Sequence, residues 1–381
     1  MVKLEKFVTS LLTIILVILA GLFIWLFQTK WRQPLGPSLA TPFELPATWT
    51  PDSQSGSALS TLEAVSIPYA LSTPENLTRT IGNCGGVSPM YVLVVGSDSR
   101  GDNYLYGLAD VIRLVRVDFV NPKVSVLEFP RDLWVEIPDI ADNLNGQDHE
   151  KLNQAYLYGN PGFGYSNDPA GGPGLLARTL TLNFGTQIDH YATVNMQTFE
   201  KIINAIGGID VTLPTTVDGR TGDDQNKRLL FPSGTHHLNG EQALTLARIR
   251  INGTFSRADN QDRVLCALRN KLTSPDIISN IPGLIQAFQG AVQTSLSPEE
   301  LSQLACLGTQ LEPQNIILAS FPQSLFAQDR TYDPVFKKGV FTWDVDYDIL
   351  RQYIQKFNSG TWPYLTTTYE QKQEGETIIC Q

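Results

Sequence analysis

Short apolar runs that end at glycine or proline alternate with amphipathic stretches from residue 90 onward. The apolar runs predict buried strands at residues 91–96, 111–119, 123–129, 191–195 and 209–213. Apolar residues at helical spacing predict helices at residues 174–182, 197–206, 240–248, 261–271, 297–307 and 347–357. Because helices recur between strands, the pattern favours a layered α/β fold.

The stretch from Phe7 to Thr29 carries no charge and is mostly Leu, Ile, Val and Phe. A helix needs about 20 apolar residues to cross a bilayer, so this stretch is long enough. A cleavable signal peptide is the alternative, but its apolar region is about 7–15 residues long and is followed by small residues. Bulky residues continue here to Phe27, which favours an uncleaved transmembrane helix at residues 7–29 after a short cytoplasmic segment, residues 1–6.

Residues 30–89 have a different composition, rich in proline, serine and threonine. Such a composition is typical of an extended spacer and not of a packed core. We therefore expect a globular domain at residues 90–273. The remaining residues, 274–381, should form an extension of helices and strands packed on the same domain.

The overall charge argues against a nucleic-acid partner. The chain has 28 basic and 38 acidic residues, a net charge of −10, whereas nucleic-acid-binding domains are normally basic. Its arginines are therefore local features of an acidic protein, which favours a focused anion site.

The four cysteines, Cys84, Cys266, Cys306 and Cys380, form no CxxC pair, and the chain has 4 histidines, so a zinc site is not expected. The adjacent histidines at 236 and 237 are predicted to lie in a turn. Basic residues flank the predicted anchor on both sides, so charge does not fix its orientation. An even number of spaced cysteines suits disulfides in an oxidising, extracytoplasmic compartment, with buried free thiols as the alternative. We expect the pairs Cys266–Cys306 and Cys84–Cys380.

Acidic and basic residues follow the ends of the predicted strands. Asp98-Ser99-Arg100 follows the first strand, Asp110 begins the second, and Arg131-Asp132 follows the third. The arginine fork matches phosphate oxygens two at a time. Two carboxylates with open positions suit magnesium, which also takes phosphate oxygens. The pattern predicts a site for a metal-bound pyrophosphate; the alternative is an ordinary turn and a local ion pair of little energetic value.

A second basic group follows the predicted helix at 240–248. Arg248 and Arg250 are two residues apart, so an extended chain would place them on one face. A polar loop follows, and then Arg257, Gln261 and Arg263. Residues 252–254 of this loop are Asn-Gly-Thr, a composition typical of a mobile segment that can cover a ligand. A solvated basic run is the alternative.

Taken together and in their order along the chain, these segments resemble the LytR-CpsA-Psr family of bacterial envelope enzymes. The resemblance covers residues 90 to about 273. Each similar segment is weak alone, and their order and span carry the resemblance. In the family's order they are residues 96–100, Asp110, residues 130–132, 151–156, 188–211 and 238–250.

The resemblance implies a membrane-anchored, single-pass protein of the cell membrane with an extracytoplasmic three-layer αβα sandwich around a mixed sheet. It implies transfer of a polyprenyl-pyrophosphate-linked glycan to peptidoglycan, with release of polyprenyl phosphate and a pyrophosphatase side activity. Its partners would be that glycan, peptidoglycan and the membrane, but no nucleic acid. Its cofactor would be Mg²⁺, or Mn²⁺, on Asp98 and Asp110. The implied catalytic residues are Asp98, Asp110, Arg100 and Arg131, and the implied pyrophosphate ligands are Arg100, Arg131, Lys151, Arg248, Arg250 and Gln261.

Two departures from the family pattern affect this expectation. The family usually has Arg-Ser where this chain has Leu108-Ala109, and Arg-Gln where it has Asn260-Gln261. A charge-assisted hydrogen bond is worth about 1.5–3 kcal/mol, so each missing arginine costs about ten- to a hundredfold. Arg113 should not replace either one, because strand positions 110 and 113 face opposite sides. A non-catalytic, regulatory protein that binds polyprenyl phosphate or a wall polymer is the alternative function.

Overall fold

A computed structural model describes residues 29–40, 79–99, 104–221, 223–250, 254–274, 291–363 and 377–379, and the single residues 18, 21, 25 and 283. Within these residues, the centre of the fold is a mixed sheet of seven strands in the order β13-β8-β3-β4-β5-β14-β17. Their bounds are β3 Met90–Ser97, β4 Ala109–Asp118, β5 Lys123–Glu128, β8 His190–Asn195, β13 Gln293–Thr294, β14 Ile316–Ser320 and β17 Thr377–Ile379.

The directions of the strands create one functional edge. Strand β3 is parallel to β8, and β5 is parallel to β14, whereas β4 is antiparallel to both β3 and β5. The carboxyl ends of β3, β5, β8 and β14 therefore meet at one edge of the sheet, together with the start of β4. Ligands of open α/β sheets bind at such an edge.

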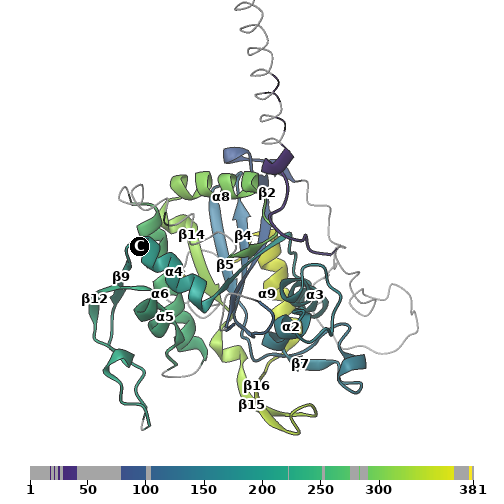
Figure 1. Ribbon diagram of the computed structural model, residues 1–381. Helices are drawn as coiled ribbons and strands as arrows, with labels where there is room; N and C mark the ends of the chain where they lie inside the picture. The colour runs from purple at the N-terminus through teal and green to yellow at the C-terminus, as the bar shows by residue number, and fades with distance from the viewer. Residues whose placement is uncertain are drawn as a thin grey trace, which may run out of the picture.

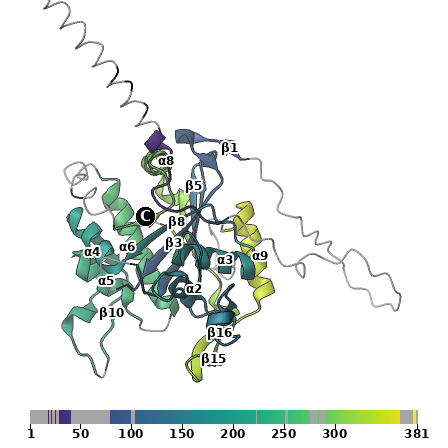
Figure 2. The ribbon, with the colours of Figure 1, turned by 45° about the vertical axis from the view of Figure 1, so that its right-hand side comes forward.

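Helices cover both faces of the sheet (Figures 1 and 2). One face packs against α2 (Leu152–Gly159), α3 (Gly172–Phe184) and α9 (Tyr347–Ser359). The other lies against α8 (Pro298–Gln310) and α6 (Thr254–Leu272), with α4 (Met196–Ala205) and α5 (Gly240–Arg248) beside α6. Side chains of β3 alternate between the faces, Tyr91 and Leu93 toward α3 and Met90 and Val92 toward α8. The expected layered α/β fold with a mixed sheet is confirmed.

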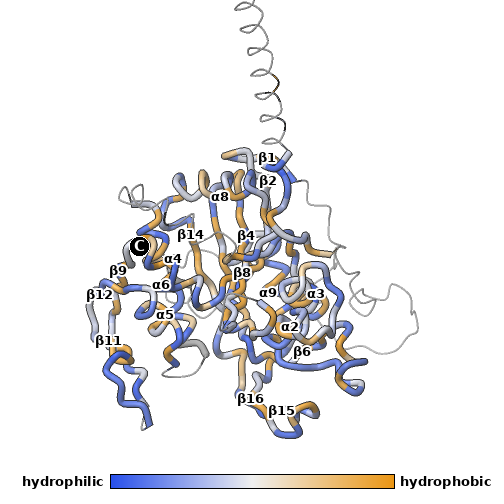
Figure 3. Tube along the Cα trace, in the orientation of Figure 1, coloured by the Kyte–Doolittle hydropathy of each residue, from blue (hydrophilic) through white to orange (hydrophobic). Residues whose placement is uncertain are grey.

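Besides a short N-terminal pair of strands described below, four two-stranded ribbons lie outside the seven-stranded sheet in the described residues. Hydrophobic residues run along the central strands in Figure 3. The ribbons are β6 (Trp134–Glu136) with β7 (His149–Lys151), β9 (Ile209–Leu213) with β12 (Gly234–Leu238), β10 (Val217–Asp218) with β11 (Leu230–Phe231), and β15 (Ala327–Asp333) with β16 (Lys338–Asp344). Single-turn 3-10 helices lie at Asn83–Gly85, Ala141–Asn143, Lys227–Leu229, Pro313–Asn315 and Gln323–Leu325. His236 and His237 lie in β12, so the predicted turn is wrong: Val211 and Asp210 pair with them across the ribbon.

The structured region begins before residue 90. Strands β1 (Thr80–Ile81) and β2 (Val87–Ser88) pair with each other inside the stretch expected to be a spacer. The Asn83 N–H donates to Phe119 O at 2.7 Å, and the Leu35 N–H donates to Leu296 O at 3.1 Å. Both sides of the expected spacer therefore contact the folded domain, while residues 41–78 lie outside the described residues.

A membrane anchor was predicted at residues 7–29. Within the described part of the chain, no helix is both long enough and apolar enough to span a bilayer. Most of the stretch at residues 7–29 lies outside that part.

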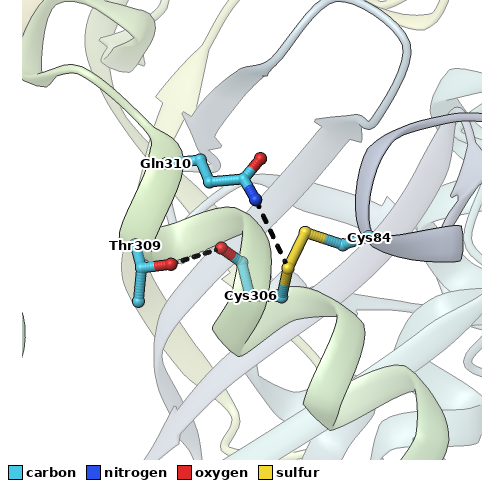
Figure 4. Close-up of a disulfide and its surroundings, with 4 residues drawn as sticks. All are labelled: Cys84, Cys306, Thr309 and Gln310. Atoms are coloured by element: carbon cyan, nitrogen blue, oxygen red, sulfur yellow. Dashed lines mark hydrogen bonds between the residues drawn. A yellow bond between two sulfur atoms is a disulfide. The ribbon is translucent and has the colours of Figure 1, made fainter.

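The disulfide pairing differs from the expected one. Cys84 is bonded to Cys306 of α8, with a Cα–Cα distance of 5.9 Å, so both expected pairs are wrong (Figure 4). Cys84 reaches α8 because the turn between β1 and β2 packs at the α8 side of the sheet. Cys266 is also disulfide-bonded, and Cys380 lies outside the described residues.

Candidate functional site

Asp110 is the extra residue of a β-bulge at the functional edge. Gly96 pairs with Val111 and Ser97 pairs with Ala109, which leaves Asp110 between the two pairs. Glycine permits this close approach, since a Cβ atom at residue 96 would lie 2.9 Å from the Val111 Cβ. A bulge re-aims a side chain away from the regular ladder. The local backbone therefore presents the Asp110 carboxylate at the end of the sheet.

Asp98 follows β3 and faces the residue that precedes the bulge. Its N–H donates to Leu108 O at 3.1 Å, and its Oδ1 accepts the Leu108 N–H at 2.6 Å. Since Leu108 is two residues before Asp110, the two acidic residues belong to the same edge, as the sequence predicts. Arg100 lies outside the described residues.

Arg131 reaches Asp110 from the end of β5. Pro130 has no N–H to continue the ladder, so β5 ends and the chain turns. An Arg131 guanidinium nitrogen makes an ion pair with Asp110 Oδ1, and Arg131 Nε lies 3.3 Å from Asp132 Oδ2. Lys151, which precedes α2, places its Nζ 3.0 Å from Asp132 Oδ1. Asp132 therefore holds two of the predicted cationic ligands at the same edge.

Arg257 of α6 completes a group of three guanidinium groups at this edge. Its NH2 donates to the backbone oxygen of Asp110 at 3.1 Å. Burial, together with the positive charges of Arg250 and Arg131, lowers the pKa of Arg257 to about 10. Removal from solvent and the charge of Arg131 also lower the pKa of Arg250, although Asp110 and Asp132 oppose that shift. Like charges this close disfavour one another, so the arrangement favours an anionic ligand.

Arg257 was not predicted as a ligand from the sequence. Residues 249–260 were expected to be a loop, but α6 begins at Thr254, so Arg257 lies on a helix. Residues four apart on a helix share a face, which puts Arg257 beside Gln261. That spacing is the signal that could have found Arg257.

Gln261 is 7% exposed and is bonded at both ends of its amide. Its Nε2 donates to Ala247 O at 3.2 Å, and its Oε1 accepts from Arg113 NH2 at 3.4 Å. It therefore links α6 to α5 and to β4. Its contact with pyrophosphate stays a prediction.

Arg248 is the last residue of α5, and Arg250 follows two residues later. Their side chains have different surroundings. Arg250 shares its surroundings with Arg131 and Asp110, and Arg248 lies near enough to affect it. Arg248 also lines a cavity of about 290 Å³ at the functional edge. The residues lining that cavity are Ser99, Met196, Gln197, Glu200, Leu244 and Arg248.

The carboxylates Asp98 and Asp110 suit a hard divalent ion that prefers oxygen ligands. Among the residues that the structure describes, no group of three or more His, Cys, Asp or Glu side chains could hold a metal. Asp98 and Asp110 provide two carboxylates at one edge, which suits an ion that takes its other ligands from phosphate and water. Magnesium binds in that way, and manganese prefers the same oxygen ligands.

Comparison with known proteins supports the order of segments seen in the sequence. The family model described as the LytR_cpsA_psr family matches residues 67–355. This range contains the described site residues, all four central parallel strands and most of α9.

Several curated proteins are similar to this chain. The polyisoprenyl-teichoic acid–peptidoglycan teichoic acid transferase TagV of Bacillus subtilis (strain 168) is 31% identical over 211 residues, covering 55% of this chain and 50% of TagV. TagU of Enterococcus faecalis (strain ATCC 700802 / V583), which has the same transferase description, is 27% identical over 237 residues, covering 61% of this chain and 70% of TagU. The match thus spans about half the length of TagV.

Solved structures show the same fold. The crystal structure of B. subtilis TagV superposes with a TM-score of 0.53 at 25% identity, covering 70% of this chain and 96% of that chain. A structure described as TagT bound to LI-WTA has a TM-score of 0.53 at 21% identity, covering 71% of this chain and 90% of that chain. The second likeness supports the fold alone.

Proposed function

This chain belongs to the LytR_cpsA_psr family, and from that premise we propose that it transfers an anionic glycopolymer from a polyprenyl-pyrophosphate carrier to peptidoglycan. A teichoic acid or a capsule polymer is the class of donor. The reaction forms a phosphodiester and releases polyprenyl phosphate. The names of TagV and TagU state transfer of polyisoprenyl-linked teichoic acid to peptidoglycan.

The observation that carries this proposal is the convergence of Arg131, Arg250 and Arg257 around Asp110. Positive charges gathered in a partly buried space need an anion to stabilise them, and a pyrophosphate offers several oxygens to the arginine forks. The acidic background of the chain leaves this edge as a focused cationic site. A pyrophosphate-linked donor fits it better than a neutral glycan does.

The chemistry follows from where these groups lie. A hydroxyl oxygen of the acceptor bonds to the phosphorus that carries the glycan. The bond from that phosphorus to the bridging oxygen breaks, and its electron pair leaves with polyprenyl phosphate. The hydroxyl proton passes to solvent. Arg131, Arg250 and Arg257 hold the oxygens and stabilise the charge that develops on them, which is the main requirement of phosphoryl transfer.

Asp98 and Asp110 would hold the divalent ion, whose charge would neutralise the pyrophosphate oxygens. Asp132 keeps Arg131 and Lys151 at the edge through its two carboxylate oxygens. We place the domain outside the cytoplasmic membrane, held by the helix predicted at residues 7–29. The Cys84–Cys306 disulfide supports an oxidising compartment.

The test uses the full chain in detergent, a polyprenyl-pyrophosphate-linked oligosaccharide as donor and peptidoglycan fragments as acceptor. Mass spectrometry measures polyprenyl phosphate and the new phosphodiester, with magnesium or with EDTA. Arg131→Ala is the site variant, and Arg330→Ala, on the exposed face of the β15–β16 ribbon, is the matched control.

We expect magnesium-dependent release that Arg131→Ala abolishes and Arg330→Ala preserves. Binding of the donor without release, in the presence of acceptor and magnesium, would overturn the enzymatic proposal and favour a non-catalytic regulatory protein. A relative of this chain, MsrR of Staphylococcus aureus (strain COL), carries the name of a regulatory protein at 28% identity over 227 residues, covering 58% of this chain and 60% of MsrR.

A further inference from the structure

Exposed apolar side chains gather at the end of the domain that follows the predicted anchor. We call this end the apolar face, and its members among the described residues are Leu35, Ile81, Val87, Val120 and Leu301, which are 39–77% exposed. They lie in the segment after the predicted anchor, in β1, in β2, in the turn between β4 and β5, and in α8. Figures 1 and 2 show α8, β1 and β2 together beside the purple N-terminal segment.

Close contacts hold three of these segments together. Ile81 pairs with Val87 across β1 and β2, so their side chains are neighbours. A Cβ atom on Gly82 would lie 2.6 Å from Val120 N, so the strand pair lies directly against the turn between β4 and β5. The disulfide described above joins the turn between β1 and β2 to α8 (Figure 4). The apolar face is therefore a fixed surface of the folded domain.

The chain binds the start of α8 within a few residues of the predicted anchor. Arg32 Nε lies 3.1 Å from Glu299 Oε2, and the Leu35 N–H donates to Leu296 O at 3.1 Å. The predicted anchor ends at residue 29, and three residues of extended chain span at most about 11 Å. The start of α8 is thereby kept close to the end of the anchor, and the apolar face with it.

Carboxylates around the apolar face have basic partners. Bilayer surfaces carry a negative potential, which repels carboxylates that have no partner. Four carboxylates at this end each lie within 4.0 Å of a basic side chain. The pairs are Asp118 with Arg116, Asp189 with Arg79, Glu299 with Arg32 and Glu300 with His190. These four carboxylates therefore do not oppose contact with anionic lipids, although the chain has a net charge of −10.

We propose that the apolar face rests on the lipid bilayer that holds the predicted anchor, with its side chains at the boundary between headgroups and acyl chains. The proposal rests on the membrane location given under the proposed function. Contiguous exposed apolar residues mark interaction sites, and amphipathic surfaces enter this boundary by about 5–10 Å. Strand β4 runs from the functional edge to Asp118, two residues before Val120. Docking through this face would therefore hold the functional edge at the end of the domain away from the bilayer.

The experiment places a photoreactive residue, p-benzoylphenylalanine, at single positions of the full chain in nanodiscs of phosphatidylcholine and phosphatidylglycerol. Positions 81 and 120 report on the apolar face, and position 18 reports on the predicted anchor. Position 335 is the matched control, because Val335 is 38% exposed in the turn of the β15–β16 ribbon, at the opposite end of the domain in Figure 1. Mass spectrometry measures the peptides that are cross-linked to lipid.

Positions 18, 81 and 120 should be cross-linked to lipid, and position 335 should not. Lipid at position 18, with no more at 81 and 120 than at 335, would overturn docking through the apolar face. Cross-links from position 81 to a second copy of the chain in place of lipid would also overturn it. Absence of lipid at position 18 would overturn the membrane location in the proposed function, and this proposal with it.

A pair of charged variants tests the face directly, with the photoreactive residue at position 87. Ile81→Glu with Val120→Glu should remove most lipid cross-links, whereas Tyr332→Glu with Val335→Glu, which adds the same charges to the β15–β16 ribbon, should keep them. Equal cross-linking in the two variants would overturn the proposal. Release of polyprenyl phosphate in detergent tests the reaction separately: cross-links at 81 and 120 in a chain without that activity would overturn the proposed reaction and support docking.

Discussion

Arg113 and Glu128 are directly paired across β4 and β5, and the Arg113 NH2 donates to Glu128 Oε2 at 2.9 Å. Asp262 of α6 pairs with the other terminal nitrogen of Arg113. The Arg113 side chain is 3% exposed, so this ion group is buried between the sheet and α6. It holds α6 at the position from which Arg257 and Gln261 reach the functional edge.

Replacing Arg113 with Met should destabilise the protein by about 3–5 kcal/mol, since it leaves two buried carboxyl groups without their cation. Burial already raises the pKa of Glu128 to about 7 and raises the pKa of Asp262. The loss should therefore be smaller at about pH 5, where the carboxyl groups take up protons, than at about pH 8. Urea unfolding at both pH values measures it. The triple variant R113M/E128L/D262L should recover the stability; a triple variant as unstable as R113M would contradict this explanation.

The disulfide joins residues that are 222 positions apart in the sequence. Removing a native disulfide typically costs about 2–5 kcal/mol, because the unfolded chain regains the entropy of a long loop. Cys84→Ser with Cys306→Ser should lower the free energy of unfolding by that amount. Denaturant unfolding of the oxidised proteins is the measurement, and a reductant, which also opens the disulfide of Cys266, should make the variant and the unmodified chain equally stable. Equal stability of variant and parent would refute a structural role.

Local pattern accounts for what the sequence predicted well. Strand β3 is an apolar run that ends beside Gly96, and α5 has the same bounds in the sequence prediction and in the structure, with a capping box at Asn239 and Gln242. The β15–β16 ribbon was not predicted, because Ala327–Asp333 has no alternation of apolar residues. Helix α2 was missed because its 8 residues give too short a helical pattern.

Long-range relationships account for what the sequence predicted poorly. The meeting of Asp98, Asp110 and Arg131 could be predicted, since each follows or begins a strand of one sheet. The partner of Cys84 could not, because it depends on how β1 and β2 pack beside Phe119 and α8. The buried pairing of Arg113 with Asp262 likewise joins a strand to a helix that follows much later in the chain.

The arginines of the site should contribute unequally. Arg131→Ala and Arg257→Ala should each weaken binding of magnesium pyrophosphate about ten- to a hundredfold, the value of a charge-assisted hydrogen bond of about 1.5–3 kcal/mol. Arg131→Lys should recover part of this affinity, because a point charge cannot reproduce two parallel hydrogen bonds. Isothermal titration measures binding, and circular dichroism checks the fold. Full recovery by lysine would exclude bidentate binding.

Glu300 should make stability depend on acid pH. Burial disfavours its charge, but His190 and the N-cap residue Ser297 outweigh this and lower the pKa of Glu300 to about 2. A depressed carboxyl pKa stabilises the fold above the unfolded value of about 4.5 and loses this effect as pH falls toward 2. Because the side chain is partly exposed, we expect the Glu300 carboxylate to contribute about 1–2 kcal/mol to the free energy of unfolding. Between about pH 5 and pH 3, Glu300→Gln should lose less stability than the parent, whereas Glu299→Gln should follow the parent.

Leu108 occupies a position where the family usually has arginine, and its N–H binds the Asp98 carboxylate at 2.6 Å. Because the Leu108 backbone contacts the Asp98 carboxylate, an arginine at 108 would start beside the carboxylates of the functional edge. Leu108→Arg should therefore add a phosphate contact and raise the affinity for magnesium pyrophosphate about tenfold.

The matched control is Leu105→Arg, which adds the same charge at a 43% exposed position of the same loop. Titration calorimetry at two salt concentrations separates a direct contact from a general gain of positive charge. An equal gain from both variants would contradict the assignment of position 108 to the site, and a gain from Leu108→Arg alone, accompanied by faster release of polyprenyl phosphate, would support it.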